Sequence, residues 1–387
     1  MIAYNKIWLD NLSNREKSIN DFYPNIFTDI QKENIENQYP VGFYSPNFFV
    51  RIGLFILTFI IAGFSLGLLS LLFISNVGYS FNFLLLFFGL VSYGLLEFFV
   101  RFKNHYQSGL DDALLWISAI SVVVSLNLLL AITLSLNALL ICVLSVYFSV
   151  RFLDKIMTAI AIAAFMALVF LLYIKAGSFA KATSPFVLMM IASLIYFYTK
   201  NKFQENNYKH YYSNGIVIKI TSLLLIYFAG NYFVVREMSN RFFNLASKVN
   251  GDIPFAWVFW IFTIAIPILY IWWGLKKKDI FTLRTGLLLI AAMVFTVRYY
   301  HSVLPLEIAM LLGGIILISI SYAVTKYLVL PKNGFTATNI DTPNKQSKLN
   351  IESLIIAETF SNNTNAAAHD TNFGGGSGGG AGASGQF

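Results

Sequence analysis

The sequence FFVRIGLFILTFIIAGFSLGLLSLLFI runs from Phe48 to Ile74 and holds 27 residues with a single charge, Arg51, near its start. A helix that crosses a bilayer needs about 20 apolar residues. Because no water in the bilayer core can satisfy free backbone groups, a segment this apolar must close its own hydrogen bonds as a helix. The stretch therefore predicts a membrane-spanning helix.

The composition of the whole chain supports the same interpretation. Hydrophobic residues make up 57% of the 387 residues and charged residues only 12%, whereas soluble proteins carry about 25% charged residues. The net charge of +8 comes from basic residues in short loops between apolar runs. That placement is typical of topology control, not of a groove that follows phosphates. We therefore predict the lipid bilayer as a partner and no nucleic acid.

Nine further apolar runs resemble the first, so the sequence predicts an all-α, polytopic transmembrane helical bundle of about ten spans. The predicted spans are Phe48–Ile74, Phe81–Val100, Leu110–Leu130, Asn137–Phe152, Lys155–Ile174, Pro185–Thr199, Ile216–Val235, Phe255–Leu275, Ile280–Tyr300 and Pro305–Leu330. We expect the sixth to extend backward through Thr183.

Lysines and arginines predict the orientation. With the N-terminus inside, 20 of the 27 fall in inner segments, six fall in outer loops, and Lys219 lies within a span. Cytoplasmic loops retain such an excess, so both termini are predicted to be cytoplasmic. Residues 1–47 are expected to form a helical hairpin, 48–330 the bundle, and 331–387 a polar, Gly-rich flexible tail. Either extension, 1–47 or 331–387, is a candidate binding segment for a cytoplasmic protein.

Cysteine and histidine usage limits the chemistry. Cys142 is the only cysteine, and the four histidines lie far apart in different loops. An intramolecular disulfide is excluded, and a metal centre is not expected. The phosphate-loop, serine-hydrolase and zinc-protease motifs are missing from the sequence. We predict no catalytic residue, no metal and no cofactor.

Four motifs carry a resemblance to a family of bacterial, Bacteroidota-type multi-pass membrane proteins with a glycine-rich C-terminal tail. They are YPVGFYSPN from Tyr39, SGLDDALLW from Ser108, AGNYFVVRE from Ala229, and FTVRYYHSVLP from Phe295. The tail FGGGSGGGAGASGQF, from Phe373, is similar to tails of other prokaryotic membrane-associated families. The resemblance spans the chain and implies a bacterial inner-membrane location. It implies no activity.

One candidate ligand-binding cluster lies at the predicted outer face. Its members are Asn231, Arg236, Glu237, Arg241, Arg298, His301 and Glu307. If the helix ends that carry them meet, guanidinium groups, an imidazole and two carboxylates share one cavity, which suits an anionic ligand. The alternative is that these charges simply mark helix ends. We favour the alternative.

A second candidate cluster lies at the predicted inner face. Glu97, Arg101 and His105 are spaced i, i+4 and i+8, so we expect them along one side of a helix that extends the second span. Asp111 and Asp112 begin the next helix. A carboxylate at the lip of a bundle can relay protons or bind a cation. The alternative, which we favour, is that Glu97 pairs with Arg101 and the aspartates cap the third span.

Small and polar residues within the spans predict helix packing. Gly63 and Gly67 form G-x-x-x-G in the first span, which suits close packing within the chain or a homo-oligomer. We favour packing within the chain. Four polar residues are expected to make interhelical hydrogen bonds. They are Asn127, Asn137, Ser145 and Thr158.

Three hypotheses for function remain. The leading one is a non-enzymatic scaffold or sensor that presents its cytoplasmic extensions to partners. The second is a secondary transporter of a small solute, with an anion as one option, built from five-plus-five inverted repeats. The third is an enzyme acting on envelope or lipid-linked substrates through Glu237 or Glu307, His301 and the arginines.

Overall fold

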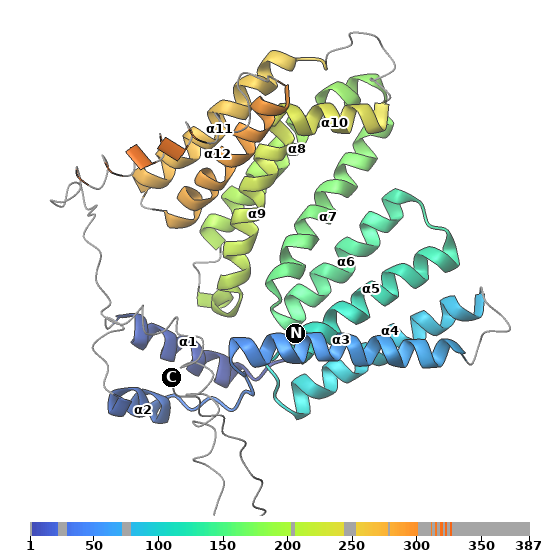
Figure 1. Ribbon diagram of the computed structural model, residues 1–387, viewed down its shortest axis with the longest axis vertical. Helices are drawn as coiled ribbons and strands as arrows, with labels where there is room; N and C mark the ends of the chain where they lie inside the picture. Colours follow the sequence, from blue (N-terminus) through green and yellow to red (C-terminus); the bar gives the residue numbers. More distant parts are fainter. Residues whose placement is uncertain are drawn as a thin grey trace, which may run out of the picture. The chain divides into compact units, whose positions relative to one another are not determined.

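The computed structural model describes residues 2–21, 29–71, 79–202, 206–243, 253–277 and 279–300, with seven single residues between 311 and 326. Within these ranges the chain is all-α, as predicted (Figure 1). The helices are α1 (Lys6–Asp21), α2 (Asp29–Gln38), α3 (Phe48–Leu71), α4 (Tyr79–Phe102), α5 (Leu110–Leu130), α6 (Leu134–Phe152), α7 (Lys155–Tyr173), α8 (Ser178–Lys202), α9 (Tyr212–Gly230), α10 (Tyr232–Phe243), α11 (Ala256–Lys277) and α12 (Ile280–Tyr300).

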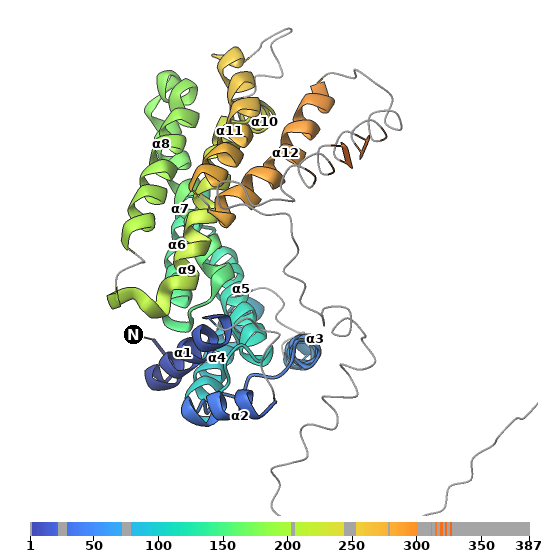
Figure 2. The ribbon, with the colours of Figure 1, turned by 90° about the vertical axis from the view of Figure 1, so that its left-hand side faces the viewer.

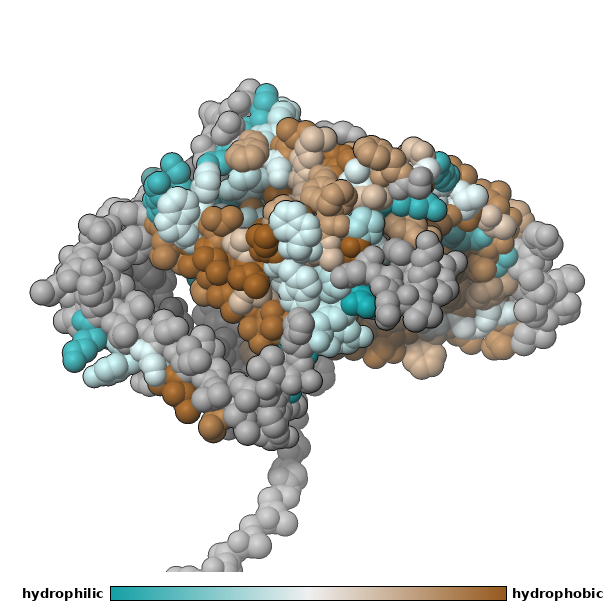
Figure 3. Space-filling view, turned by 90° about the horizontal axis from the view of Figure 1, so that it is seen from above, coloured by the Kyte–Doolittle hydropathy of each residue, from teal (hydrophilic) through white to brown (hydrophobic). Residues whose placement is uncertain are grey.

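Nine helices in the described part of the chain are long and apolar enough to cross a membrane: α3 to α9, α11 and α12. Large apolar side chains on them are exposed, with Phe64 at 71% and Leu68 at 67% as examples on α3. Brown, apolar residues cover broad areas of the face in Figure 3. Since such surface is stable in lipid and not in water, the chain is a multi-pass membrane protein. The tenth predicted span, Pro305–Leu330, falls almost entirely outside the described residues.

The sixth span extends backward through Pro185 and Thr183, as predicted, and α8 begins still earlier, at Ser178. A proline within a helix leaves the carbonyl of residue i−4 without its backbone partner, and here that residue is Lys181. The hydroxyl of Ser184 donates to the Lys181 carbonyl at 3.1 Å. A neighbouring side chain thus replaces the missing N–H, which is how spans tolerate proline.

The predicted seventh span, Ile216–Val235, is wrong at its outer end. Helix α9 stops at Gly230, Asn231 is extended with ψ 128°, and α10 begins at Tyr232. The Asn231 side chain accepts the backbone N–H of Val234 at 3.2 Å and so caps α10. Helix α10 then runs across the end of the neighbouring helices (Figure 1), and it is too short to span.

Consecutive spans form antiparallel hairpins: α4 lies beside α5, α6 beside α7, α8 beside α9, and α11 beside α12 (Figures 1 and 2). Polar side chains join the helices, as predicted for three of the four residues. Asn127 donates to Asn137 at 2.9 Å, between α5 and α6. Thr158 of α7 and Ser149 of α6 share a 2.6 Å hydrogen bond. Ser145 is buried.

The start of the chain packs onto the ends of these hairpins. The backbone N–H of Ala3 donates to the Arg151 carbonyl at 2.9 Å. Tyr44 forms an isolated β-bridge with His105, and Asp10 of α1 pairs with Lys209 at 2.8 Å. Residues 1–18 and 32–47 therefore belong to the same packed unit as the bundle, whereas residues 19–31 are assigned to a second unit.

Helix α3 has no buried residue. Apart from the adjacent residues and the backbone of α3 itself, no atom of the described residues lies within 4 Å of the point where a Cβ would stand on Gly63 or Gly67. The intramolecular packing that we favoured for these glycines is thus not found in the described part of the chain. A homo-oligomer through the same face stays a prediction.

Candidate functional site

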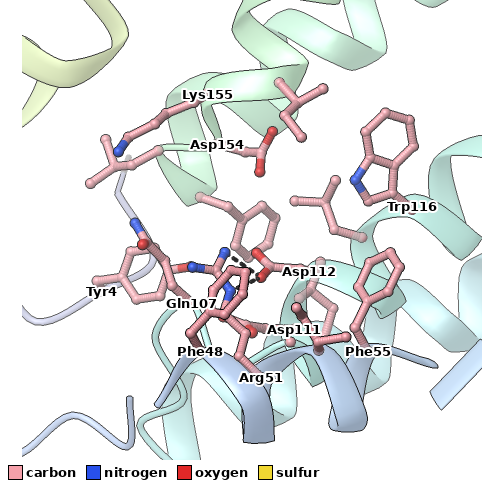
Figure 4. Close-up of a pocket in the computed structure, with 17 residues that line it drawn as sticks. Tyr4, Phe48, Arg51, Phe55, Gln107, Asp111, Asp112, Trp116, Asp154 and Lys155 are labelled. Atoms are coloured by element: carbon pink, nitrogen blue, oxygen red, sulfur yellow. Dashed lines mark hydrogen bonds and ion pairs between the residues drawn. The ribbon is translucent and has the colours of Figure 1, made fainter. Parts of the chain in front are cut away.

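A cavity of about 560 Å³ lies where α3, the start of α5 and the α6–α7 connection meet, at the end that the basic residues assign to the cytoplasm (Figure 4). Its wall combines charged and aromatic side chains from separate elements. The lining residues used below are Tyr4, Phe48, Arg51, Phe55, Gly109, Asp111, Asp112, Trp116, Phe152, Asp154 and Lys155.

Arg51 and Asp112 form the only ion pair drawn among the lining residues in Figure 4. Both Nε, at 3.0 Å, and Nη2, at 2.6 Å, donate to Oδ2 of Asp112. Helix α3 starts at the right place for this contact because Asn47 caps it, accepting the N–H of Val50 at 2.8 Å. The pair joins α3 to α5 and neutralises one of the cavity's carboxylates.

Gly109 lets α3 come this close to α5. Its φ is +90°, a left-handed conformation that side chains rarely adopt. A Cβ built on it would stand 2.0 Å from the carbonyl oxygen of Arg51. The glycine is therefore required twice, for its backbone conformation and for the space it leaves.

Asp111 is buried, with 3% of its surface exposed. Its Oδ1 accepts the backbone N–H of Ser108 at 2.8 Å and the Ser108 hydroxyl at 3.0 Å. The Ser108 oxygen lies 2.7 Å from Nδ1 of His105. Because the only hydroxyl proton points to Asp111, His105 must be the donor in that contact. Burial lowers the pKa of His105, so the ring is a neutral structural donor, not a base acting on Ser108.

Asp154 precedes α7 and caps it, accepting the N–H of Met157 at 2.6 Å. The carboxylate points into the cavity, toward the Arg51–Asp112 pair, whereas the Lys155 ammonium points away (Figure 4). Burial raises the pKa of Asp154, although the bond from Met157 opposes the shift. Among the described contacts, no cationic side chain donates a hydrogen bond to Asp154, so its negative charge is not neutralised in this way.

Tyr4 closes the cavity from the N-terminal segment. The ring is 7% exposed and meets the edge of Tyr106 at a centroid distance of 4.9 Å. Burial, and then the nearby aspartates, raise the pKa of its phenol. A residue from the first few positions of the chain is therefore part of a site built by spans about 100 residues later.

The structure brings together part of the predicted inner-face cluster. Asp111 and Asp112 do line one cavity, but neither aspartate caps α5: the cap residue, Gly109, has no side chain to do so. Glu97 pairs with Arg101 at 2.8 Å, as expected, and also with Arg151. His105 does not continue the helix, since α4 ends at Phe102 and the chain turns back there to bridge Tyr44.

The outer-face residues are only partly brought together. Asn231 is buried and donates to Tyr227 at 2.9 Å and to Thr296 at 3.0 Å, so it joins helices and does not face a ligand. Arg236 stacks over Tyr300 at 5.1 Å and donates to the Tyr232 hydroxyl. A cavity of about 470 Å³ lies beneath α10, but its wall is apolar. It includes none of the predicted charged residues Arg236, Glu237, Arg241 and Arg298. His301 and Glu307 lie outside the described residues.

Sequence reasoning did not assign Tyr4, Arg51 or Asp154 to the site. Arg51 was visible as the one charge in the first span, and Asp154 as the acid between two spans, but their meeting place depends on tertiary packing. In the described ranges no three His, Cys, Asp or Glu side chains are arranged to hold a metal ion. Comparison with protein-family models, with curated proteins and with solved structures finds no match.

Proposed function

We propose that this multi-pass membrane protein is a non-enzymatic sensor of a bacterial inner membrane, and that it binds a small organic cation in the cavity of Figure 4. The single observation that carries the proposal is the cavity wall, which the N-terminal segment and three parts of the bundle build together. A ligand there touches a spanning helix and the cytoplasmic segment at once. Ligand binding can thus change the position of residues that a cytoplasmic partner can contact.

The charges in the wall favour a cation over the anion considered from sequence. The cavity wall carries three carboxylates, Asp111, Asp112 and Asp154, and two cations, Arg51 and Lys155. Arg51 is committed to Asp112, and Lys155 points out of the cavity (Figure 4). A guest therefore meets an excess of negative charge at Asp154.

Aromatic rings complete the wall and suit an organic ammonium group more than a bare ion. Tyr4, Phe48, Phe55, Trp116 and Phe152 line the cavity. The face of an aromatic ring attracts a cation with about 0.5–2 kcal/mol, depending on desolvation. The volume of about 560 Å³ is in the range of small-molecule sites.

Ligand-induced stabilisation of the full chain in detergent tests the proposal. Methylammonium, tetramethylammonium and putrescine, each compared with sodium chloride at equal ionic strength, are the probes. We expect at least one to raise the unfolding midpoint saturably, and Asp154→Asn to weaken that response at least tenfold. Glu33→Gln removes an exposed acid on α2, outside the cavity, and should respond like the wild type. Equal responses of the wild type and Asp154→Asn would refute the site.

Secondary transport is a second candidate, and one observation favours it. The α6–α7 hairpin borders a cavity at each end: Phe152–Ile156 line the charged one, while Ala138, Ile141 and Ala163 line the apolar one. Alternating access needs sites reachable from both sides of a bundle. Proteoliposome uptake of the cation that stabilises the protein separates the two functions, because a sensor binds it without net flux. Nothing in the described residues favours the third hypothesis, an enzyme at the outer face.

A further inference from the structure

A second cleft, separate from the cavity of Figure 4, lies among the ends of α8 and α11 and the starts of α9 and α12. Its volume is about 440 Å³. The basic residues place it at the cytoplasmic end of these helices. Its lining includes Lys200, Lys219, Trp273, Lys277, Asp279 and Ile280.

One lysine of the cleft is neutralised within the protein. Lys219 of α9, which from sequence lay within a span, forms an ion pair with Asp279 just before α12. Asp279 also accepts the Thr282 hydroxyl at 2.7 Å. Burial alone would raise the pKa of Asp279, but the bonds from Lys219 and Thr282 outweigh it and lower the pKa. The carboxylate is therefore ionised and balances Lys219.

The charges of the other two lysines are not neutralised by any described residue. Lys200, near the end of α8, and Lys277, at the end of α11, are exposed, and neither forms an ion pair or hydrogen bond with any described residue. They reach the cleft from different helices. The cleft thus carries two free ammonium groups around an already neutral pair, which favours an anionic guest.

The rim of the cleft has the features of a membrane interface. Trp273 is 42% exposed and Ile280 58% exposed. Indole rings prefer the headgroup level of a bilayer, and basic pockets between spans on the cytoplasmic side are suited to phosphate headgroups. Free phosphate would need no apolar rim.

We propose that this cleft binds the phosphate group of an anionic membrane lipid, with Lys200 and Lys277 as its ligands and Trp273 beside its glycerol. The Lys219–Asp279 pair forms the floor and holds α9 against α12. The lipid phosphate then links α8 to α11, which have no direct ion pair in the described contacts at this end.

The experiment measures the affinity of phosphatidylglycerol relative to phosphatidylcholine for the purified full chain, by native mass spectrometry of lipid retained after titration in detergent. Each surface lysine adds about 1 kcal/mol to binding of anionic lipid, or about a fivefold change in affinity. We expect Lys277→Gln to weaken phosphatidylglycerol binding about fivefold, and Lys200→Gln with Lys277→Gln about twenty-five-fold. Lys277→Arg should retain binding.

Lys276→Gln is the matched control. It removes the same charge at the neighbouring position, and the Lys276 side chain does not line the cleft. It should change the affinity less than twofold. An equal loss in Lys276→Gln and Lys277→Gln would overturn the proposal, because binding would then follow net charge alone. A second arm adds inorganic phosphate or glycerol phosphate at millimolar concentration. Displacement of the lipid by either one at that concentration would also overturn it, since it would identify a soluble phosphate as the guest.

Discussion

Arg151 of α6 forms a two-point ion pair with Glu97 of α4. Nη2 donates to Oε2 at 2.9 Å and Nε donates to Oε1. Only 14% of the Arg151 side chain and 16% of the Glu97 side chain are exposed. Glu97 also pairs with Arg101, one turn further along α4, whose side chain is 54% exposed. A single carboxylate thus serves a buried arginine between two hairpins and an exposed arginine on its own helix.

The two arginines should differ in their contribution to stability. Removing one partner of a buried pair costs about 3–5 kcal/mol, because a buried charge is left uncompensated, whereas an exposed pair contributes at most about 1 kcal/mol. We therefore expect Glu97→Gln to lower the free energy of unfolding by about 3 kcal/mol and Arg101→Gln by less than about 1 kcal/mol. Titration with a denaturing detergent in mixed micelles measures both. Similar losses in the two variants would contradict the assignment.

Gly109→Ala should be more harmful than Gly177→Ala, although both glycines have positive φ. Left-handed backbone costs a side chain about 1–2 kcal/mol. The Cβ at residue 177 meets nothing within 4 Å, while that at 109 collides with the Arg51 backbone, and overpacking adds about 1–3 kcal/mol. The same denaturation assay should show a clearly larger loss for Gly109→Ala. Equal losses would mean that α3 moves away from α5 at no cost.

Asp154 should make stability depend on pH. Burial raises the pKa of its carboxyl above the unfolded value, so the stabilising contribution of the protonated form is present below about pH 4 and is lost as pH rises through the folded pKa. Asp154→Asn keeps a capping oxygen and removes the charge. We expect its unfolding midpoint to exceed that of the wild type at pH 7.5 and to match it near pH 4.

The cap itself has a separate test at that position. Asp154→Ala loses both the charge and the capping bond to Met157, so it should be about 1 kcal/mol less stable than Asp154→Asn. Parallel pH profiles of the wild type and Asp154→Asn would rule out a raised pKa. These midpoints refer to the ligand-free protein. The cation-binding test therefore compares, for each variant, the shift in unfolding midpoint that the cation causes.

Lys219 and Asp279 should behave as a coupled pair. Asp279→Asn keeps the oxygen that accepts the Phe281 N–H but leaves the Lys219 charge without its partner. Lys219→Met leaves the Asp279 carboxylate without its cationic partner. We expect each single variant to lose about 3 kcal/mol and the double variant to lose clearly less than the sum. A double-mutant cycle measures this difference, and strictly additive losses would show that the pair is not coupled.

The basic residues predict which side of the membrane each loop faces. In a Cys142→Ala background, Lys103→Cys probes the connection between α4 and α5, and Lys175→Cys probes the connection between α7 and α8; both positions are exposed. We expect a membrane-impermeant maleimide to label residue 175 in intact spheroplasts and residue 103 only after permeabilisation. The reverse labelling would invert the proposed topology and move both sites to the opposite face.

The sequence was sufficient for the features that depend on local composition. Apolar runs of about 20 residues predict the spans, because the bilayer makes each run satisfy its own backbone. The end of α9 was mispredicted because Asn231 is one polar residue between apolar neighbours on both sides. Its side chain caps α10 through the N–H of Val234, but its second partner, Thr296, lies 65 residues further along the chain and is not visible in the local sequence.

The site was predictable only in part, for a related reason. Asp111 and Asp112 follow each other in a loop-to-helix junction, so their proximity is local. Arg51 is 61 residues from Asp112, and nothing in its sequence neighbourhood indicates that partner. Periodicity predicts which face of a helix is apolar, but it does not predict which helix end meets which loop.

The bond from Ala3 to Arg151 has a consequence for biogenesis. The ribosome makes Ala3 and Tyr4 before the Arg151 carbonyl and the Tyr106 ring that contact them, which emerge 100 or more residues later. Ala3 and Tyr4 can therefore dock only after at least four spans, α3 to α6, have been made, and only then can the cavity close. A bulky group attached beside Ala3 would interfere with that final step even after every span had inserted correctly.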